Sequence, residues 1–107
     1  MTADNELLEM AGKAAGLKVQ YSNNFGDFSI GEPYSHGEIR WNPLTDDGDA
    51  LRLMVKLKMC IYRTDAYLSA RTSGGDQIEF IEMGEDPGVL TRRAIVREAA
   101  RIGRAMP

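Results

Sequence analysis

The sequence has little of what fixes small folds covalently or around a metal ion. Its 107 residues include one cysteine, Cys60, and one histidine, His36. A single cysteine excludes an intrachain disulfide and any zinc site built from several cysteines, and a single histidine excludes a histidine-rich metal site. Cys60 lies in the apolar run 59–62, so we expect a buried structural thiol. This cysteine usage is typical of a reducing, cytosolic compartment.

Long hydrophobic runs are missing as well. No apolar stretch approaches the roughly 20 residues that a membrane-spanning helix needs. The first 16 residues are acidic and amphipathic, and they lack the basic start and apolar centre of a signal peptide. We therefore expect a cytoplasmic protein that has no membrane partner.

The motifs of common enzymes and cofactor sites are also missing. The sequence has no Walker A, G-x-G-x-x-G or G-x-S-x-G pattern. Gly74 and Gly75 are typical of a turn and do not form a phosphate loop. We therefore predict no cofactor and no catalytic residues, and expect that the protein is not an enzyme.

The charge is divided along the chain. Residues 1–88 hold 8 Lys or Arg and 15 Asp or Glu, a net charge of −7, whereas residues 89–107 hold 5 Arg and 1 Glu, a net charge of +4. The whole chain has a net charge of −3, and its hydrophobic and charged fractions of 43% and 27% are ordinary for a globular protein. We expect one compact domain, residues 1–107, in which a mostly acidic body carries a basic C-terminal element.

Hydrophobic periodicity predicts three helices and short strands. The helices are expected at 4–15, from 46–49 to 57, and at 87–105. The strands are expected at 19–21, 28–30, 39–41, 60–62, 66–72 and 77–82, with a possible break near 63–65. The order α-β-β-β-α-β-β-α groups the strands as hairpins. This grouping predicts an α+β fold, an antiparallel β-sheet packed with three α-helices.

The stretch Asp46-Asp47-Gly48-Asp49 allows two interpretations. Its carboxylates are ligands that hard cations prefer, but their spacing does not match a calcium-binding EF-hand loop. Acidic residues also cap the free N–H groups of a helix and favour the positive end of its dipole. We favour capping over a metal site. The apolar residues that follow cover more than half of the helix, so we expect this helix to be covered on two sides, with Leu51 in the core.

An arginine stripe marks the C-terminal helix. Arg93, Arg97, Arg101 and Arg104 fall within roughly 80° of one helix face, opposite Ile95. Three interpretations stay open: a solvated face that meets acidic neighbours, a protein-binding face, since Arg is enriched at interfaces, and a phosphate-binding face. The acidic body and the absence of interleaved aromatic residues argue against nucleic acid.

The loop 31–38 holds a second pair of candidate residues. Tyr34 and His36 lie in a Gly/Pro-rich segment, so we expect them in solvent as part of a binding face. A catalytic role for His36 has no supporting motif.

Three segments resemble those of a known family. They are NELLEMAGKAAGL near the start, WNPLTDDGDALRLMVKL in the middle and TRRAIVREAARIGRAM at the end. In this order and spacing they resemble the phage ABA sandwich domain, a family of small phage and prophage proteins. The resemblance implies an α/β sandwich and a phage or prophage setting, inside the host cell. It brings no catalytic residues.

These observations predict a non-enzymatic phage or prophage accessory protein that binds another protein, with a component of host defence as one candidate partner. One alternative is a nucleic-acid-binding accessory protein that uses the C-terminal arginine helix. A second alternative is a small ligand-binding domain or enzyme around the 31–38 loop.

Overall fold

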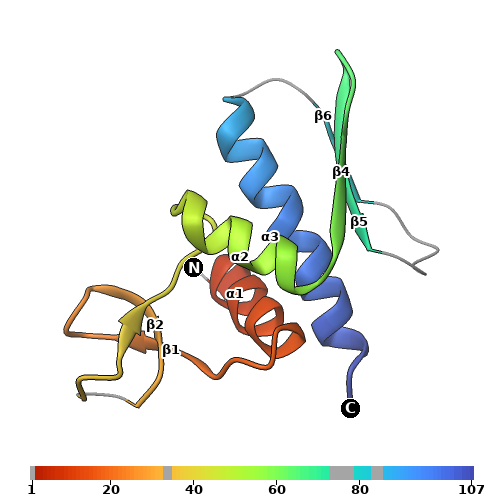
Figure 1. Cartoon of the computed structure of the whole chain (residues 1–107). Helices are drawn as coiled ribbons and strands as arrows, with labels where there is room; N and C mark the ends of the chain where they lie inside the picture. Colours follow the sequence, from red (N-terminus) through yellow and green to blue (C-terminus); the bar gives the residue numbers. More distant parts are fainter. Residues whose placement is uncertain (1, 33–34, 73–78, 83–85) are drawn as a thin grey trace.

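The structure, a computed structural model, describes residues 2–32, 35–72, 79–82 and 86–107. The elements in chain order are α1 (Thr2–Ala14), β1 (Val19–Ser22), β2 (Asp27–Ile30), β3 (Ile39–Arg40), α2 (Asp47–Lys56), β4 (Met59–Arg63), β5 (Tyr67–Thr72), β6 (Glu79–Glu82) and α3 (Pro87–Ala105) (Figure 1). The predicted α+β class and the order of elements are confirmed. The break expected near 63–65 is the turn between β4 and β5, where the Thr64 amide donates to the Tyr67 carbonyl.

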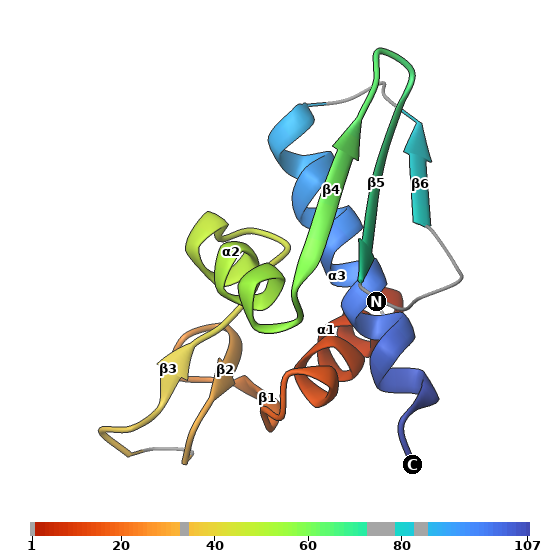
Figure 2. The same ribbon diagram turned by 45° about the vertical axis from the view of Figure 1, so that its right-hand side comes forward.

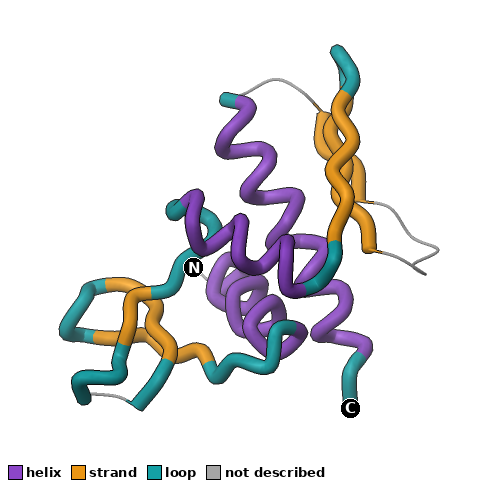
Figure 3. Tube along the Cα trace, in the orientation of Figure 1, coloured by secondary structure: helices purple, strands orange, loops and turns teal. Residues whose placement is uncertain are grey.

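The strands form two small antiparallel sheets rather than one. The first sheet has the order β1-β2-β3 and the second has the order β4-β5-β6. Figure 3 shows the two groups of strands on opposite sides of the helices. The pairing is sequential in each sheet, so both are meanders whose strands follow one another along the chain.

Helix α3 is the centre of the molecule. It runs along the second sheet and packs against α1, as Figures 1 and 2 both show. A Cβ added to Gly103 would clash with the backbone carbonyl of Met10, so α1 and α3 approach with their backbones almost in contact. The side chains of α3 that are fully buried are Ala94, Val96, Glu98, Ala99 and Ala100.

Helix α2 is more exposed than its apolar sequence suggested. Ala50 and Leu53 are buried, but Leu51 is 55% exposed and Val55 is 66% exposed. The expectation that Leu51 belongs to the core is therefore wrong. The described part of the chain covers α2 on one side and leaves an apolar strip of it in solvent.

Cys60 is exposed, which corrects the expectation of a buried thiol. The reason is the alternation of side chains along a strand. The Thr72 hydroxyl of β5 donates to Glu98 of α3, so Thr72 and its cross-strand partner Met59 share the face that contacts α3. The next residue, Cys60, therefore points to the opposite face of this sheet.

Among the described residues, no helix is long and apolar enough to span a membrane.

Candidate interaction surfaces

The four arginines of the α3 stripe do not have equivalent surroundings, because one of them, Arg101, pairs with the buried carboxylate of Glu98. The side chain of Glu98 is 0% exposed and accepts two hydrogen bonds from Arg101, at 2.8 and 2.9 Å. It also accepts from the backbone amide and the hydroxyl of Thr72, at 3.1 and 3.0 Å. Glu98 thus attaches α3 to β5, and Arg101, which holds the Glu98 carboxylate, is not a free surface cation.

Opposing effects set the pKa of the Glu98 carboxyl. Burial raises this pKa, because a charge is costly away from water. The hydrogen bonds from Arg101 and Thr72, together with the positive charge of Arg101, favour the ionised form and outweigh the effect of burial. The pKa of Glu98 therefore lies below its ordinary value, and the carboxylate stays charged at neutral pH.

The remaining arginines of the stripe differ in their partners. Arg104 forms an exposed ion pair with Glu6 of α1 at 3.3 Å. Arg93 and Arg97 are exposed, and neither has a hydrogen bond or ion pair in the part of the chain that the structure describes. Within the stripe, Arg93 and Arg97 are therefore the arginines that have no partner among the described residues.

The described residues of the loop 31–38 do not join the arginine stripe. His36 is exposed, as expected, whereas Tyr34 lies outside the described residues. The loop connects β2 to β3 at the outer end of the first sheet, and both Figures 1 and 2 place that end away from α3. His36 thus lies on a different part of the molecule from the arginine stripe.

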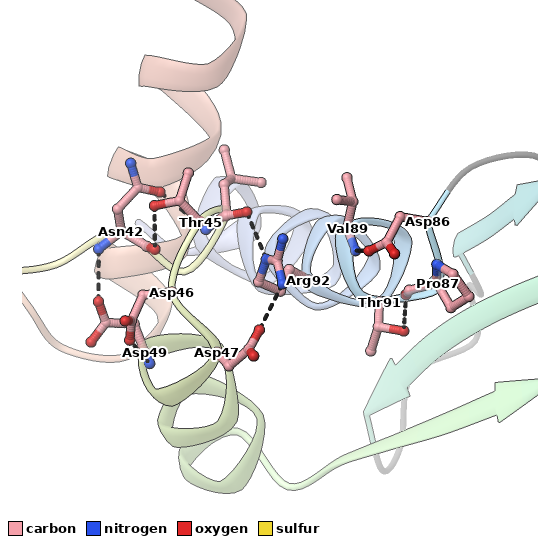
Figure 4. A network of polar contacts seen from close by, with 11 residues as sticks. Asn42, Thr45, Asp46, Asp47, Asp49, Asp86, Pro87, Val89, Thr91 and Arg92 are labelled. Atoms are coloured by element: carbon pink, nitrogen blue, oxygen red, sulfur yellow. Dashed lines mark hydrogen bonds and ion pairs between the residues drawn. The ribbon is translucent and has the colours of Figure 1, made fainter.

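The acidic stretch before α2 is a helix cap. The carboxylate of Asp46 accepts from the Asp49 amide at 2.8 Å, and Asp46 is the N-cap residue of α2. The buried carboxylate of Asp49 in turn accepts from the Asn42 amide at 2.9 Å, as Figure 4 shows. It also accepts from Arg52 at 2.6 Å. Capping, the favoured interpretation, is confirmed. In the described ranges, no group of three acidic, histidine or cysteine residues is placed to hold a metal ion.

Arg92 joins the starts of two helices. Its Nε donates to the Leu44 carbonyl at 2.9 Å, and its Nη1 donates to the Asp47 carboxylate at 2.6 Å. Figure 4 shows this guanidinium between α2 and α3, beside the Asp86 cap of α3. The sequence analysis missed Arg92 because its role depends on a contact across 45 residues.

An apolar groove lies between α2 and the first half of α3. It has a volume of about 360 Å³. Its lining includes Ala50, Leu51 and Met54 of α2 together with Thr91 and Ile95 of α3. The Arg92–Asp47 ion pair lies at its polar edge, since both residues also line it.

Comparisons with protein-family models, curated proteins and solved structures found no match to this chain. The resemblance to the phage ABA sandwich domain therefore stays a prediction.

Proposed function

We propose that this protein is a non-enzymatic accessory protein that binds another protein through the α2–α3 groove. The observation that carries the proposal is the exposure of two large aliphatic side chains of α2, Leu51, which lines the groove, and Val55, which lies one helical turn further along the helix. Contiguous apolar surface beside a groove is typical of protein contact sites. Full burial of such a side chain contributes about 1.5–3 kcal/mol, so a partner gains most by covering both.

The shape of the groove favours a helical segment of the partner. Two packed helices leave a channel that accepts the side-chain ridge of a third helix. An amphipathic helix presents aliphatic anchors at intervals of three and four residues, which matches the spacing of Leu51 and Val55 on α2. Arg92 and Asp47 neutralise each other at the edge of the groove, so this pair attracts neither charge sign of a partner strongly. The apolar contacts therefore supply most of the binding affinity.

The phage or prophage setting and a host-defence component as the partner are part of this proposal. They rest on the sequence resemblance and not on the chemistry of the groove. The binding role stands independently of them.

The test is affinity capture with a double variant, Leu51→Ser with Val55→Ser. Both side chains are exposed, so we expect the variant to fold with nearly unchanged stability and to lose a partner that the wild-type protein captures from host-cell lysate. Tyr62→Ser is the matched control, because Tyr62 is a half-exposed aromatic residue on the second sheet that does not line the groove. Capture that is unchanged in the double variant, or lost equally in the control, would contradict the proposal.

Nucleic-acid binding is the second candidate, because Arg93 and Arg97 have no partner in the described structure. Two phosphate contacts predict a weak complex whose log–log salt slope is about −2. Arg93→Gln with Arg97→Gln is the variant to use, since changing Arg101 would also break its contact with Glu98. A mobility-shift titration at low salt that shows no binding by the wild-type protein removes this candidate.

A further inference from the structure

A second cavity lies on the other side of α2, between this helix and the first sheet. It has a volume of about 420 Å³, within the range of small-molecule sites. Its walls come from four parts of the fold: the segment that follows α1, strand β2, strand β3 with the residue after it, and α2. The apolar residues that line it include Leu17, Ile30, Ile39, Trp41 and Leu53.

The cavity and the α2–α3 groove use opposite faces of one helix. The α2 residues that line the cavity include Asp49, Arg52 and Lys56, whereas Leu51 and Met54 line the groove. At 100° per residue, the two sets lie about half a turn apart. A ligand in the cavity and a protein in the groove would therefore not compete for the same side chains.

Cations surround the cavity although the protein is acidic. Arg40, Arg52 and Lys56 line it together with one carboxylate, Asp49, a local net charge of +2 in a chain whose net charge is −3. The Asp49 carboxylate is already neutralised, because it accepts from the Asn42 amide and from Arg52.

Arg40 and Lys56 differ in their contacts with the rest of the protein. The guanidinium carbon of Arg40 lies 5.6 Å from the centre of the Phe25 ring, and its Nη2 donates to the Phe25 carbonyl at 3.3 Å. These two contacts hold the guanidinium in place. Lys56 is exposed and has no side-chain partner among the described residues. Its ammonium group is therefore free to pair with an anion at the cavity.

We propose that this cavity binds a small amphipathic carboxylate, an organic acid whose apolar body enters between Trp41 and Leu53 and whose carboxylate meets Lys56 and Arg40. An apolar amine fits poorly, because like charges would meet at the rim. A strongly polar anion such as inorganic phosphate leaves the apolar walls without a partner. The combination of apolar walls and a cationic rim selects a molecule that has both properties.

The chain supplies its own reporter of binding. Trp41 is the single tryptophan, is 4% exposed, and lines the cavity. We would titrate the 107-residue chain with octanoate and measure tryptophan fluorescence, with 1-octanol and octylamine as matched neutral and cationic probes. A saturable change with octanoate, a weaker response to octanol and none to octylammonium are expected.

Variants locate the charge that selects the ligand. Lys56→Gln is expected to weaken octanoate binding by about two- to fivefold, the usual range for one exposed ion pair. Arg63→Gln, which removes an exposed cation from β4, is expected to leave binding unchanged. Shifts of the Leu17 and Leu53 amides in two-dimensional NMR spectra provide a second readout that does not depend on fluorescence.

Two results would overturn the proposal. One is the absence of a saturable change in both fluorescence and amide shifts across the soluble range of octanoate. The other is an equal response to octanoate, octanol and octylammonium, which would show nonselective apolar binding.

Discussion

At the scale of single residues, Glu98 shows how a charge is held inside a small protein. A buried carboxylate that loses its partners is strongly destabilising. Glu98 keeps four hydrogen bonds, two from Arg101 and two from Thr72. The two bonds from Thr72 attach α3 to β5, whereas those from Arg101, one turn along the same helix, hold the carboxylate in its charged form. This one side chain therefore helps to position the central helix on the second sheet.

Replacing Glu98 by Gln should lower the free energy of unfolding by about 1–3 kcal/mol at pH 7, because the charge-assisted bonds are lost. The pKa of Glu98 is lowered in the folded state from its ordinary value of 4.5. Its contribution is therefore fully present well above pH 4.5 and is lost as the pH falls through the lowered pKa. Chemical denaturation at several pH values should show the difference between wild type and Glu98→Gln shrinking below about pH 4.5.

Glu6→Gln is the matched control for this prediction, because Glu6 is an exposed carboxylate whose ion pair with Arg104 is also exposed. Glu6→Gln should change the free energy of unfolding only slightly at every pH. A difference between wild type and Glu98→Gln that stays constant from pH 7 to pH 3 would show that ionised Glu98 does not stabilise the fold.

Some residue-scale features were predictable from the sequence and others were not. The capping role of Asp46 was predictable, because a cap is a contact between residues three positions apart. The burial of Glu98 and its effect on Arg101 were not, because they depend on Thr72, which is 26 residues away in the sequence. The exposure of Cys60 was missed because an apolar run does not show which face of a strand will be covered.

At the scale of elements, local signals located the helices well. Helix α3 spans Pro87–Ala105, the range that the sequence predicts, because Asp86 caps it and Pro87 starts it. Helix α2 starts at Asp47 after the Asp46 cap, also as predicted. The assignment of faces was less successful, since the exposed strip at Leu51 and Val55 becomes visible only once the neighbours of α2 are known.

Asp46→Ala should destabilise the protein by about 1 kcal/mol, the usual cost of losing an N-cap side chain. The cap also supports Asp49, which holds the Asn42 amide before the helix. Asp46→Asn should stay close to wild type, because Asn caps as well as Asp. Thermal unfolding of the two variants checks this, and equal stability of Asp46→Ala and wild type would show that the cap is not needed.

At the scale of the whole molecule, α2 lies between two surfaces of different chemistry. Figure 2 shows α2 between the first sheet and α3. The cationic cavity lies on the side of the first sheet, and the apolar groove lies on the side of α3. The sequence did not predict the two separate sheets that create this arrangement, because strand pairing is set by contacts between distant segments. It did predict the α+β class, since hairpin-like groups of strands between helices favour antiparallel sheets.

We propose that the α2–α3 groove contacts another protein. The most direct test is to place a photo-crosslinking amino acid at position 51 and, as a control, at position 62, and to irradiate each protein in host-cell lysate. We expect a discrete crosslinked adduct with one partner at position 51 and no such adduct at position 62. Val55→Ser should reduce the yield of the adduct at position 51. No adduct at position 51, or the same adducts at both positions, would contradict it.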